Sequence, residues 1–141
     1  MRIFDYIRGH FALLTGRKIS TVAGRASFVI ERVHSLENPA SGWLMEIKIT
    51  SSGESYQLYL SDILTVYTEI INNYWSESGS KWVALADVKR LLSKSGVDDF
   101  KSSYIMALLA TFDDIKTRKG PKPAIRYIPF QEQFDEYHVV E

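Results

Sequence analysis

The sequence predicts an α+β fold in which an amino-terminal helix and a small, mostly antiparallel sheet precede a carboxy-terminal lobe of helices. Two observations carry this prediction. Apolar residues recur at helical spacing in four segments of the chain. Between residues 18 and 60 the period changes to two, and β-branched and aromatic residues become frequent, which is typical of strands.

The amino-terminal half is expected to hold one helix and four strands. The apolar spacing predicts a helix over residues 2 to 14, which Gly16 ends because glycine tolerates the left-handed conformation. Strands are expected at residues 18 to 22, 27 to 33, 43 to 50 and 55 to 60. In the clearest strand, from Trp43 to Thr50, apolar side chains alternate with polar ones except at Leu44, so that one face is expected to be buried.

The second half is expected to be mainly helical, with a polar break before it. Helices are expected at residues 61 to 75, 85 to 94 and 99 to 112, the first capped by Ser61-Asp62 and the last by Asp98 or Asp99. The loop-forming stretch from Ser76 to Ser80 predicts a boundary between a lobe of residues 1 to 75 and a lobe of residues 81 to 141, within one compact domain. A short strand is expected from Ala124 to Ile128.

Length and composition limit what the protein can be. A chain of 141 residues fits one domain with its own core. The absence of cysteine excludes disulfides, thiolate nucleophiles and thiolate metal sites, and fits a reducing cytoplasm. The amino-terminal run from Met1 to Leu14 carries several charges, so we expect no signal peptide, no membrane contact and a cytoplasmic location.

The order of elements from residue 61 to about residue 130 resembles a winged helix-turn-helix. Two helices are separated by a four-residue turn with glycine, and a basic loop and a strand follow them. In that family the second helix of the pair lies in the DNA major groove and a basic hairpin contacts the backbone. The resemblance implies binding to nucleic acid, expected to be duplex DNA, through Lys101, Ser102 and Ser103 on the helix and Lys116, Arg118, Lys119 and Lys122 at the wing.

The sequence also departs from that family in three respects. The presumed recognition helix has only one basic side chain, and aspartates lie at both of its ends. The basic loop precedes the one expected strand, whereas a wing needs a strand on each side. The alternative is a helical lobe that contacts protein.

Charge is distributed unevenly although 17 basic and 17 acidic residues cancel, so any positive field must be local. Five basic residues and no acidic one lie between Lys116 and Arg126. A second concentration of basic residues comes before residue 33. This part of the sequence has only two acidic residues, Asp5 and Glu31, and six basic ones: Arg2, Arg8, Arg17, Lys18, Arg25 and Arg32. The second group predicts either one part of a bipolar surface or solvated strand edges, where basic residues discourage aggregation.

The acidic tail predicts protein contact. Phe130, Phe134 and Tyr137 would share one face of a helix among acidic neighbours, which suits an adaptor or a self-associating oligomer. The alternative is a tail that folds back on its own core.

Enzymatic signals are weak. Glu46-Ile47-Lys48 resembles the metal-binding half-motif of the PD-(D/E)xK nucleases, with Glu31 or Glu37 as the upstream acid, but the same pattern is ordinary on the solvent face of a strand. His10, His34 and His138 lie far apart. We therefore expect no catalytic residue, metal or cofactor.

The predicted function is a non-enzymatic nucleic-acid-binding accessory or regulatory module. A strand-rich half that contains Ser51-Ser52-Gly53-Glu54-Ser55, followed by a compact helical half, also resembles modules of bacterial DNA-processing and defence systems. A protein adaptor is the alternative, and a metal-dependent nuclease is the remote one.

Overall fold

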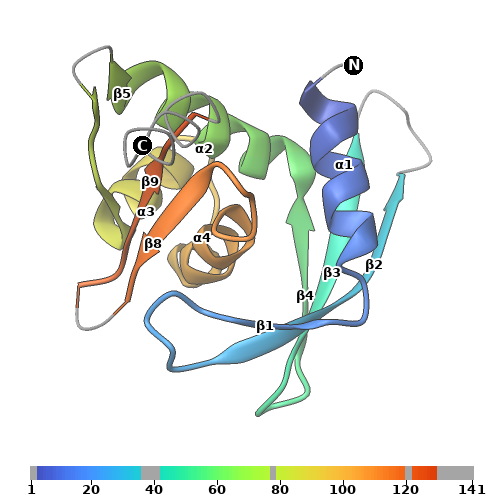
Figure 1. Cartoon of the computed structure of the whole chain (residues 1–141). Coiled ribbons are helices and arrows are strands. Elements are labelled where there is room, and N and C mark those ends of the chain that lie inside the picture. Colours follow the sequence, from blue (N-terminus) through green and yellow to red (C-terminus); the bar gives the residue numbers. More distant parts are fainter. Residues whose placement is uncertain (1–2, 36–41, 77–78, 120–121, 130–141) are drawn as a thin grey trace, which may run out of the picture.

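The computed structural model describes residues 3–35, 42–76, 79–119 and 122–129, and Figure 1 shows their arrangement. The fold is mixed α+β, as predicted. Within these residues, four α-helices accompany a four-stranded sheet, a three-stranded sheet and a two-stranded hairpin, and every strand pair is antiparallel. None of these helices combines the length and the apolar character that crossing a bilayer would need.

The first half forms a helix and a sheet, close to the predicted ranges. Helix α1 (Ile3–Leu13) precedes β1 (Lys18–Ser20), β2 (Ser27–Ser35), β3 (Trp43–Ile49) and β4 (Ser55–Tyr59), which lie in the order β1-β2-β3-β4. The predicted buried face of β3 is confirmed for Met45, Ile47 and Ile49, and Lys48 is exposed as expected, but Leu44 on the other face is buried as well. Apolar residues of one sheet face, such as Phe28, and of α1, such as Phe11, belong to one buried cluster.

The second half alternates short strands with helices. Its elements are α2 (Leu60–Asn73), β5 (Trp75–Ser76), β6 (Gly79–Ser80), β7 (Val83–Ala84), α3 (Leu85–Ser93), the 3₁₀ turn η2 (Asp99–Lys101), α4 (Ser102–Leu109), β8 (Ile115–Arg118) and β9 (Ala124–Tyr127). Strands β7, β9 and β8 form the three-stranded sheet in that order, and β5 pairs with β6. The core cluster unites both halves, since Val88 and Ile125 belong to it together with Phe11.

Three local predictions need correction. Helix α2 begins at Leu60, directly after the extended Tyr59, and no side chain caps it, so Ser61-Asp62 is not its cap. The segment predicted as one helix over residues 99 to 112 divides into η2 and the shorter α4, and Asp98 makes no capping hydrogen bond. The polar stretch after Tyr74 contains the paired strands β5 and β6, because Trp75 and Ser76 find backbone partners at Ser80 and Gly79.

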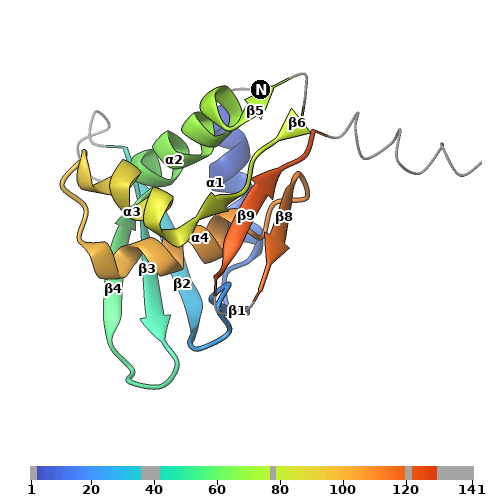
Figure 2. The same cartoon turned by 90° about the vertical axis from the view of Figure 1, so that its left-hand side faces the viewer.

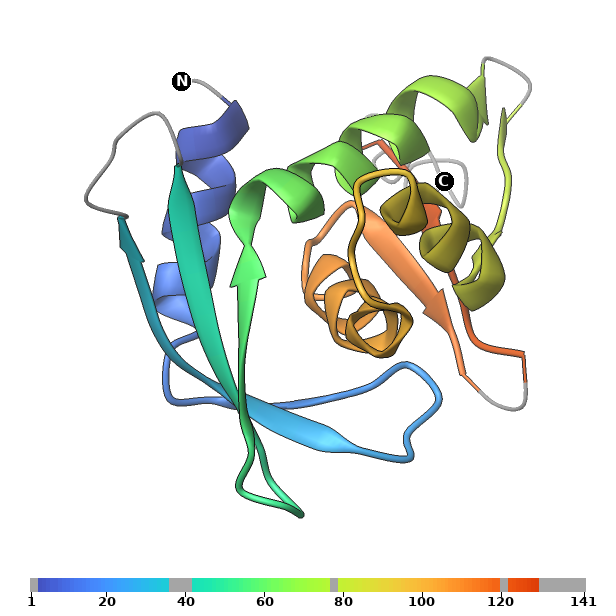
Figure 3. The same cartoon turned by 180° about the vertical axis from the view of Figure 1, so that it is seen from behind.

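Helix α4 lies inside the molecule, between the four-stranded sheet and the three-stranded sheet, as Figure 3 shows. Five successive residues from Ile105 to Leu109 are buried. On the side of the four-stranded sheet, the ring of Tyr104 meets the ring of Phe28, with their centroids 5.3 Å apart. The helix that the sequence pattern places in a DNA groove is therefore covered by the amino-terminal sheet.

Candidate nucleic-acid interface

The most basic part of the described chain is the β8–β9 pair, which we name the basic hairpin after Lys116, Arg118, Lys119, Lys122 and Arg126. Strand β8 lies directly before the basic loop, at a place where no strand was expected. In the register, Lys116 is opposite Arg126, and Arg118 is opposite Ala124. Directly opposed residues share a face of a sheet, so Lys116, Arg118 and Arg126 lie on one face.

Trp82 orders two of these cations. The guanidinium carbons of Arg118 and Arg126 each lie 5.1 Å from the centre of the Trp82 ring, and the indole is 36% exposed. The Nε of Arg118 also donates a hydrogen bond of 3.4 Å to the carbonyl oxygen of Lys122. Contacts of this kind hold an arginine in place before a ligand arrives, which lowers the entropy cost of binding.

The carboxylates closest in sequence to the basic hairpin are Asp113 and Asp114, and Asp114 already has a partner in the protein. The hydroxyl of Tyr67 donates a hydrogen bond of 2.5 Å to Oδ2 of Asp114. The pKa of Tyr67 is raised, mainly by burial of the hydroxyl and secondly by this hydrogen bond. No acidic residue occurs from Ile115 to Pro129 in the sequence, so the hairpin itself carries only positive charge.

Three residues of the presumed recognition helix were predicted to contact nucleic acid, and the structure places them in three different environments. The side chain of Ser102 has no exposed surface, and its hydroxyl has no hydrogen-bond partner among the described residues. Ser103 lines a cavity of about 220 Å³ together with Arg25 and Pro123, beside the basic hairpin. We therefore leave Ser102 out of the candidate interface and keep Ser103 at its edge.

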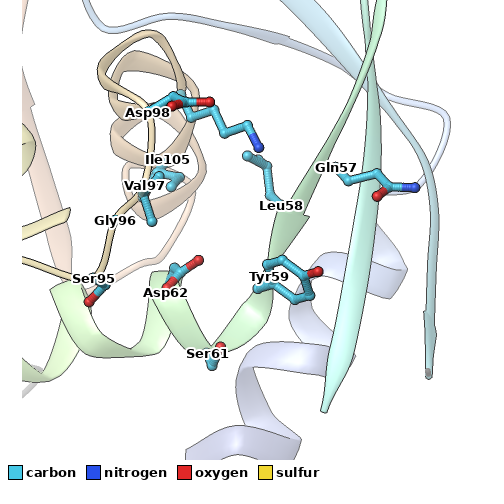
Figure 4. A pocket seen from close by; sticks show the side chains of 11 residues that line it. Gln57, Leu58, Tyr59, Ser61, Asp62, Ser95, Gly96, Val97, Asp98 and Ile105 are labelled. Carbon is cyan, nitrogen blue, oxygen red and sulfur yellow. The ribbon is translucent and has the colours of Figure 1, made fainter. Parts of the chain in front are cut away.

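Lys101 lies in different surroundings. It lines a cavity of about 270 Å³ that also holds Asp62 and Asp98, which Figure 4 shows. Burial raises the pKa of the Asp62 carboxyl, and the positive charge of Lys101 opposes that effect. Lys101 therefore lies beside carboxylates and away from the cavities at the basic hairpin.

The Glu46-Lys48 pair lies on the solvent face of the four-stranded sheet. Arg32 donates a hydrogen bond to Glu46 and lowers the pKa of that carboxyl, and Glu31 accepts a hydrogen bond of 3.0 Å from Ser55. Within the described ranges, no three histidine or acidic side chains gather closely enough to hold a metal ion. Glu37, the other proposed upstream acid, lies outside those ranges.

The predicted partner-binding residues Phe130, Phe134 and Tyr137 also lie outside the described residues, as does His138. Their role stays a prediction.

Two residues of this arrangement, Trp82 and Arg126, were not among the predicted contacts. The alternation of Ile115-Lys116-Thr117-Arg118 is a strand pattern that indicates β8, and with it the opposition of Lys116 and Arg126. Nothing in the sequence pairs Trp82 with these arginines, because the contact depends on the pairing of β7 with β9.

Comparison with known proteins gives no further guide to this site. No family model matches the chain, and neither a curated protein nor a solved structure does.

Proposed function

We propose that the protein is a non-enzymatic nucleic-acid-binding module, accessory or regulatory in its role, which contacts the phosphate backbone of duplex DNA through the basic hairpin. The observation that carries this proposal is the concentration of five cations and no carboxylate on one short hairpin of a neutral protein. Arg118 and Arg126 are also held by Trp82. Phosphate contacts by lysine and arginine supply most of the affinity of sequence-independent binding.

We further propose that the second half is a winged helix. The order α2, β7, α3, α4, β8 and β9, with β9 between β7 and β8 in the sheet, supports this assignment. Strands on both sides of the basic loop remove one of the departures noted in the sequence. One departure from the winged-helix family remains, because the amino-terminal sheet covers α4. A helix can enter the major groove only if one of its faces is exposed.

The covered helix determines how this module would bind. Without α4 in the groove, side chains of the basic hairpin contact phosphates, which carry no direct sequence information. We therefore expect similar affinity for duplexes of different sequence and a strong dependence on salt. Dissociation constants of about 10⁻⁴ to 10⁻⁶ M at physiological salt are typical of such contacts.

The test is fluorescence anisotropy with a labelled duplex of about two helical turns, repeated over a series of salt concentrations. The variant Lys119→Ala/Lys122→Ala removes two exposed cations of the basic hairpin, and Lys89→Ala/Lys94→Ala removes two exposed cations next to α3 or within it. We expect the first variant to weaken binding and to reduce the salt slope by about 0.9 for each phosphate that is no longer neutralised. The matched control should bind like the unaltered protein.

Two results would contradict the proposal. If the intact protein does not bind duplex DNA at low salt, the proposed function is wrong. If both double variants weaken binding equally, binding depends on overall charge and the basic hairpin is not the site.

The adaptor function has no structural support because its aromatic residues lie outside the described ranges. It remains the alternative that the sequence predicts.

A further inference from the structure

The turn between β1 and β2 lies beside the basic hairpin although the two are far apart in the sequence. Figures 1 and 2 show these two hairpins next to each other. Arg25 of the turn and Pro123 of the basic hairpin line the same cavity. Thr21 of the turn and Lys119 of the basic hairpin line a second cavity of about 200 Å³. The fold thus brings Arg25, which belongs to the second basic concentration of the sequence, beside the basic hairpin.

The charged side chains that line the cavities at this turn are all basic. A third cavity, of about 360 Å³, is lined by Lys18 and Arg25. Among the described residues, no carboxylate lines any of these three cavities. By contrast, the cavity at the start of α2 contains Asp62 and Asp98, and the concave surface at α1 contains Asp5 and Asp113. Positive charge is therefore gathered where the two hairpins meet.

Backbone hydrogen bonds hold the turn in shape. The N–H of Thr21 donates to the carbonyl of Ala26 at 2.9 Å, and the N–H of Gly24 donates to the carbonyl of Thr21 at 2.8 Å. Gly24 has a φ of 75°, a conformation that glycine adopts without the strain of a side chain. Arg25 is consequently an exposed cation on an ordered turn, and little backbone order has to be gained when it meets a ligand.

The polar groups around Lys18 and Arg25 suit phosphate. The cavity that these cations share is otherwise lined largely by hydroxyl side chains: Ser20, Ser27, Thr50 and Ser51. Arginine, lysine, serine and threonine side chains are among the groups that donate hydrogen bonds to nucleic-acid phosphates. A row of cations with hydroxyls therefore continues the basic hairpin onto the amino-terminal sheet.

We infer that the turn between β1 and β2 is a second phosphate-contacting element, and that the ligand is a duplex held by both hairpins at once. This inference rests on the proposed function and adds the amino-terminal sheet to the site. The two hairpins belong to different sheets around one core, so their separation is fixed. A duplex presents phosphates on two strands at a fixed spacing, so it is the nucleic acid that can contact two rigid basic elements together.

The test compares Arg25→Ala with Arg17→Ala, an exposed arginine just before β1. Anisotropy is measured with a duplex and with a single strand of the same length, and thermal unfolding checks that each variant is folded. We expect Arg25→Ala to weaken duplex binding about two- to fivefold, as for one exposed ion pair, and to lower the salt slope by about 0.9. Arg17→Ala should leave both quantities unchanged, and Arg25→Lys should retain most of the affinity.

The outcomes separate this inference from the proposed function. If Lys119→Ala/Lys122→Ala weakens binding while Arg25→Ala does not, the second element is wrong and the proposed function stands. If the single strand binds as tightly as the duplex, the ligand is not specifically a duplex. Failure of the intact protein to bind either nucleic acid overturns both. If Arg25→Ala does not fold, Arg25→Lys is compared with Lys119→Ala/Lys122→Ala. Because Arg25→Lys keeps the charge, an equally large reduction of its duplex affinity would contradict a phosphate contact made through charge.

Discussion

The ring of Tyr104 on α4 meets the ring of Phe28 on β2 edge to face, at a centroid separation of 5.3 Å and an interplanar angle of 79°. Tyr56 of β4 adds a second ring, 6.3 Å from Tyr104. These contacts join the amino-terminal sheet to the helix that a helix-turn-helix protein would insert into DNA. The sheet therefore stabilises α4 and also excludes ligands from that side of it.

The contact gives a prediction about stability. Phe28 is fully buried, so Phe28→Ala should lower the free energy of unfolding by about 3–5 kcal/mol, the usual range for removing a buried phenylalanine. Lys101→Ala, directly before α4, should change the free energy of unfolding by less than about 0.5 kcal/mol. Urea unfolding measures both. Lys101→Ala should also bind DNA normally, and a reduction of affinity as large as that of Lys119→Ala/Lys122→Ala would show that the start of α4 contacts the ligand.

Trp82 provides a second prediction. If its ring holds Arg118 and Arg126 in place, Trp82→Ala should weaken duplex binding about two- to fivefold, because an exposed cation–π contact is worth about 0.5–1 kcal/mol. The salt slope should stay the same, since both charges remain. Trp82→Phe, which keeps an aromatic ring, should recover part of the affinity. A smaller salt slope in Trp82→Ala would mean that fewer phosphates are neutralised. That result would contradict the view that the Trp82 ring only positions the two arginines.

Stability should fall in mildly acidic solution because of His10. Its ring stacks on Phe112 at 4.1 Å and its Nε2 lies 2.8 Å from the Thr111 hydroxyl, which itself donates to the Leu108 carbonyl. Nε2–H is therefore the donor to Thr111. Burial lowers the pKa of His10 below 6.5, while Asp113 and Asp114 partly oppose that shift.

The sign follows from linkage. Near and somewhat below pH 6.5 the unfolded chain binds a proton at His10 that the folded chain does not, so the contribution of His10 is present above pH 6.5 and is lost as the pH falls through the folded pKa. Thermal unfolding from about pH 7.5 to pH 5 measures this dependence. His10→Gln keeps a donor but does not titrate, so its stability should vary less over that range. Equal pH dependence in the two proteins would remove His10 as the cause.

The placement of Glu46 and Lys48 on the solvent face predicts that Glu46→Gln/Lys48→Gln unfolds within about 0.5 kcal/mol of the unaltered protein. Adding Mg²⁺ should change neither the melting temperature nor the integrity of a DNA substrate. Gel analysis after incubation with Mg²⁺ checks the second point. Metal-dependent cleavage that disappears in the double variant would instead support the nuclease hypothesis.

Removing residues 130 to 141 distinguishes the module from the adaptor. The deletion takes away four acidic groups, and if these screen the basic hairpin, the truncated protein should bind DNA more tightly. If the aromatic residues of the tail make an interface, truncation should abolish an oligomer or partner complex. We expect association to decrease more than DNA affinity changes. Sedimentation at matched concentrations tests this, and an identical monomer in both samples with its partner still bound would argue against a contact role for the tail.

Periodicity predicted most of the secondary structure because long amphipathic elements leave a regular pattern. The strand at Trp43 and the helix that begins at Leu85 are both found close to their expected ranges. Strands of two residues, such as β7, leave no such pattern, and backbone pairing from distant segments decides them. The start of α2 was also not predicted correctly from the sequence. The extended Tyr59 leads from β4 directly into the helix, so no capping residue marks its beginning.

The candidate site was predictable only in part. Charge counting finds the cations of the basic hairpin, since they are close together in the sequence. It does not find that Arg25 and Pro123 line one cavity or that Phe28 packs on α4, because both arrangements depend on how the two halves pack. The same packing buries Ser102, whose polarity alone predicts exposure.

The most direct test of the proposed interface is ¹⁵N NMR of the full chain during titration with a duplex of about two helical turns at low salt. The predicted result is that amide shifts gather on β8, β9 and the turn from Thr21 to Ala26, with the indole N–H of Trp82 shifting as well. No shift with duplex in excess, or shifts confined to Asp98 through Ser103, would contradict binding through the basic hairpin.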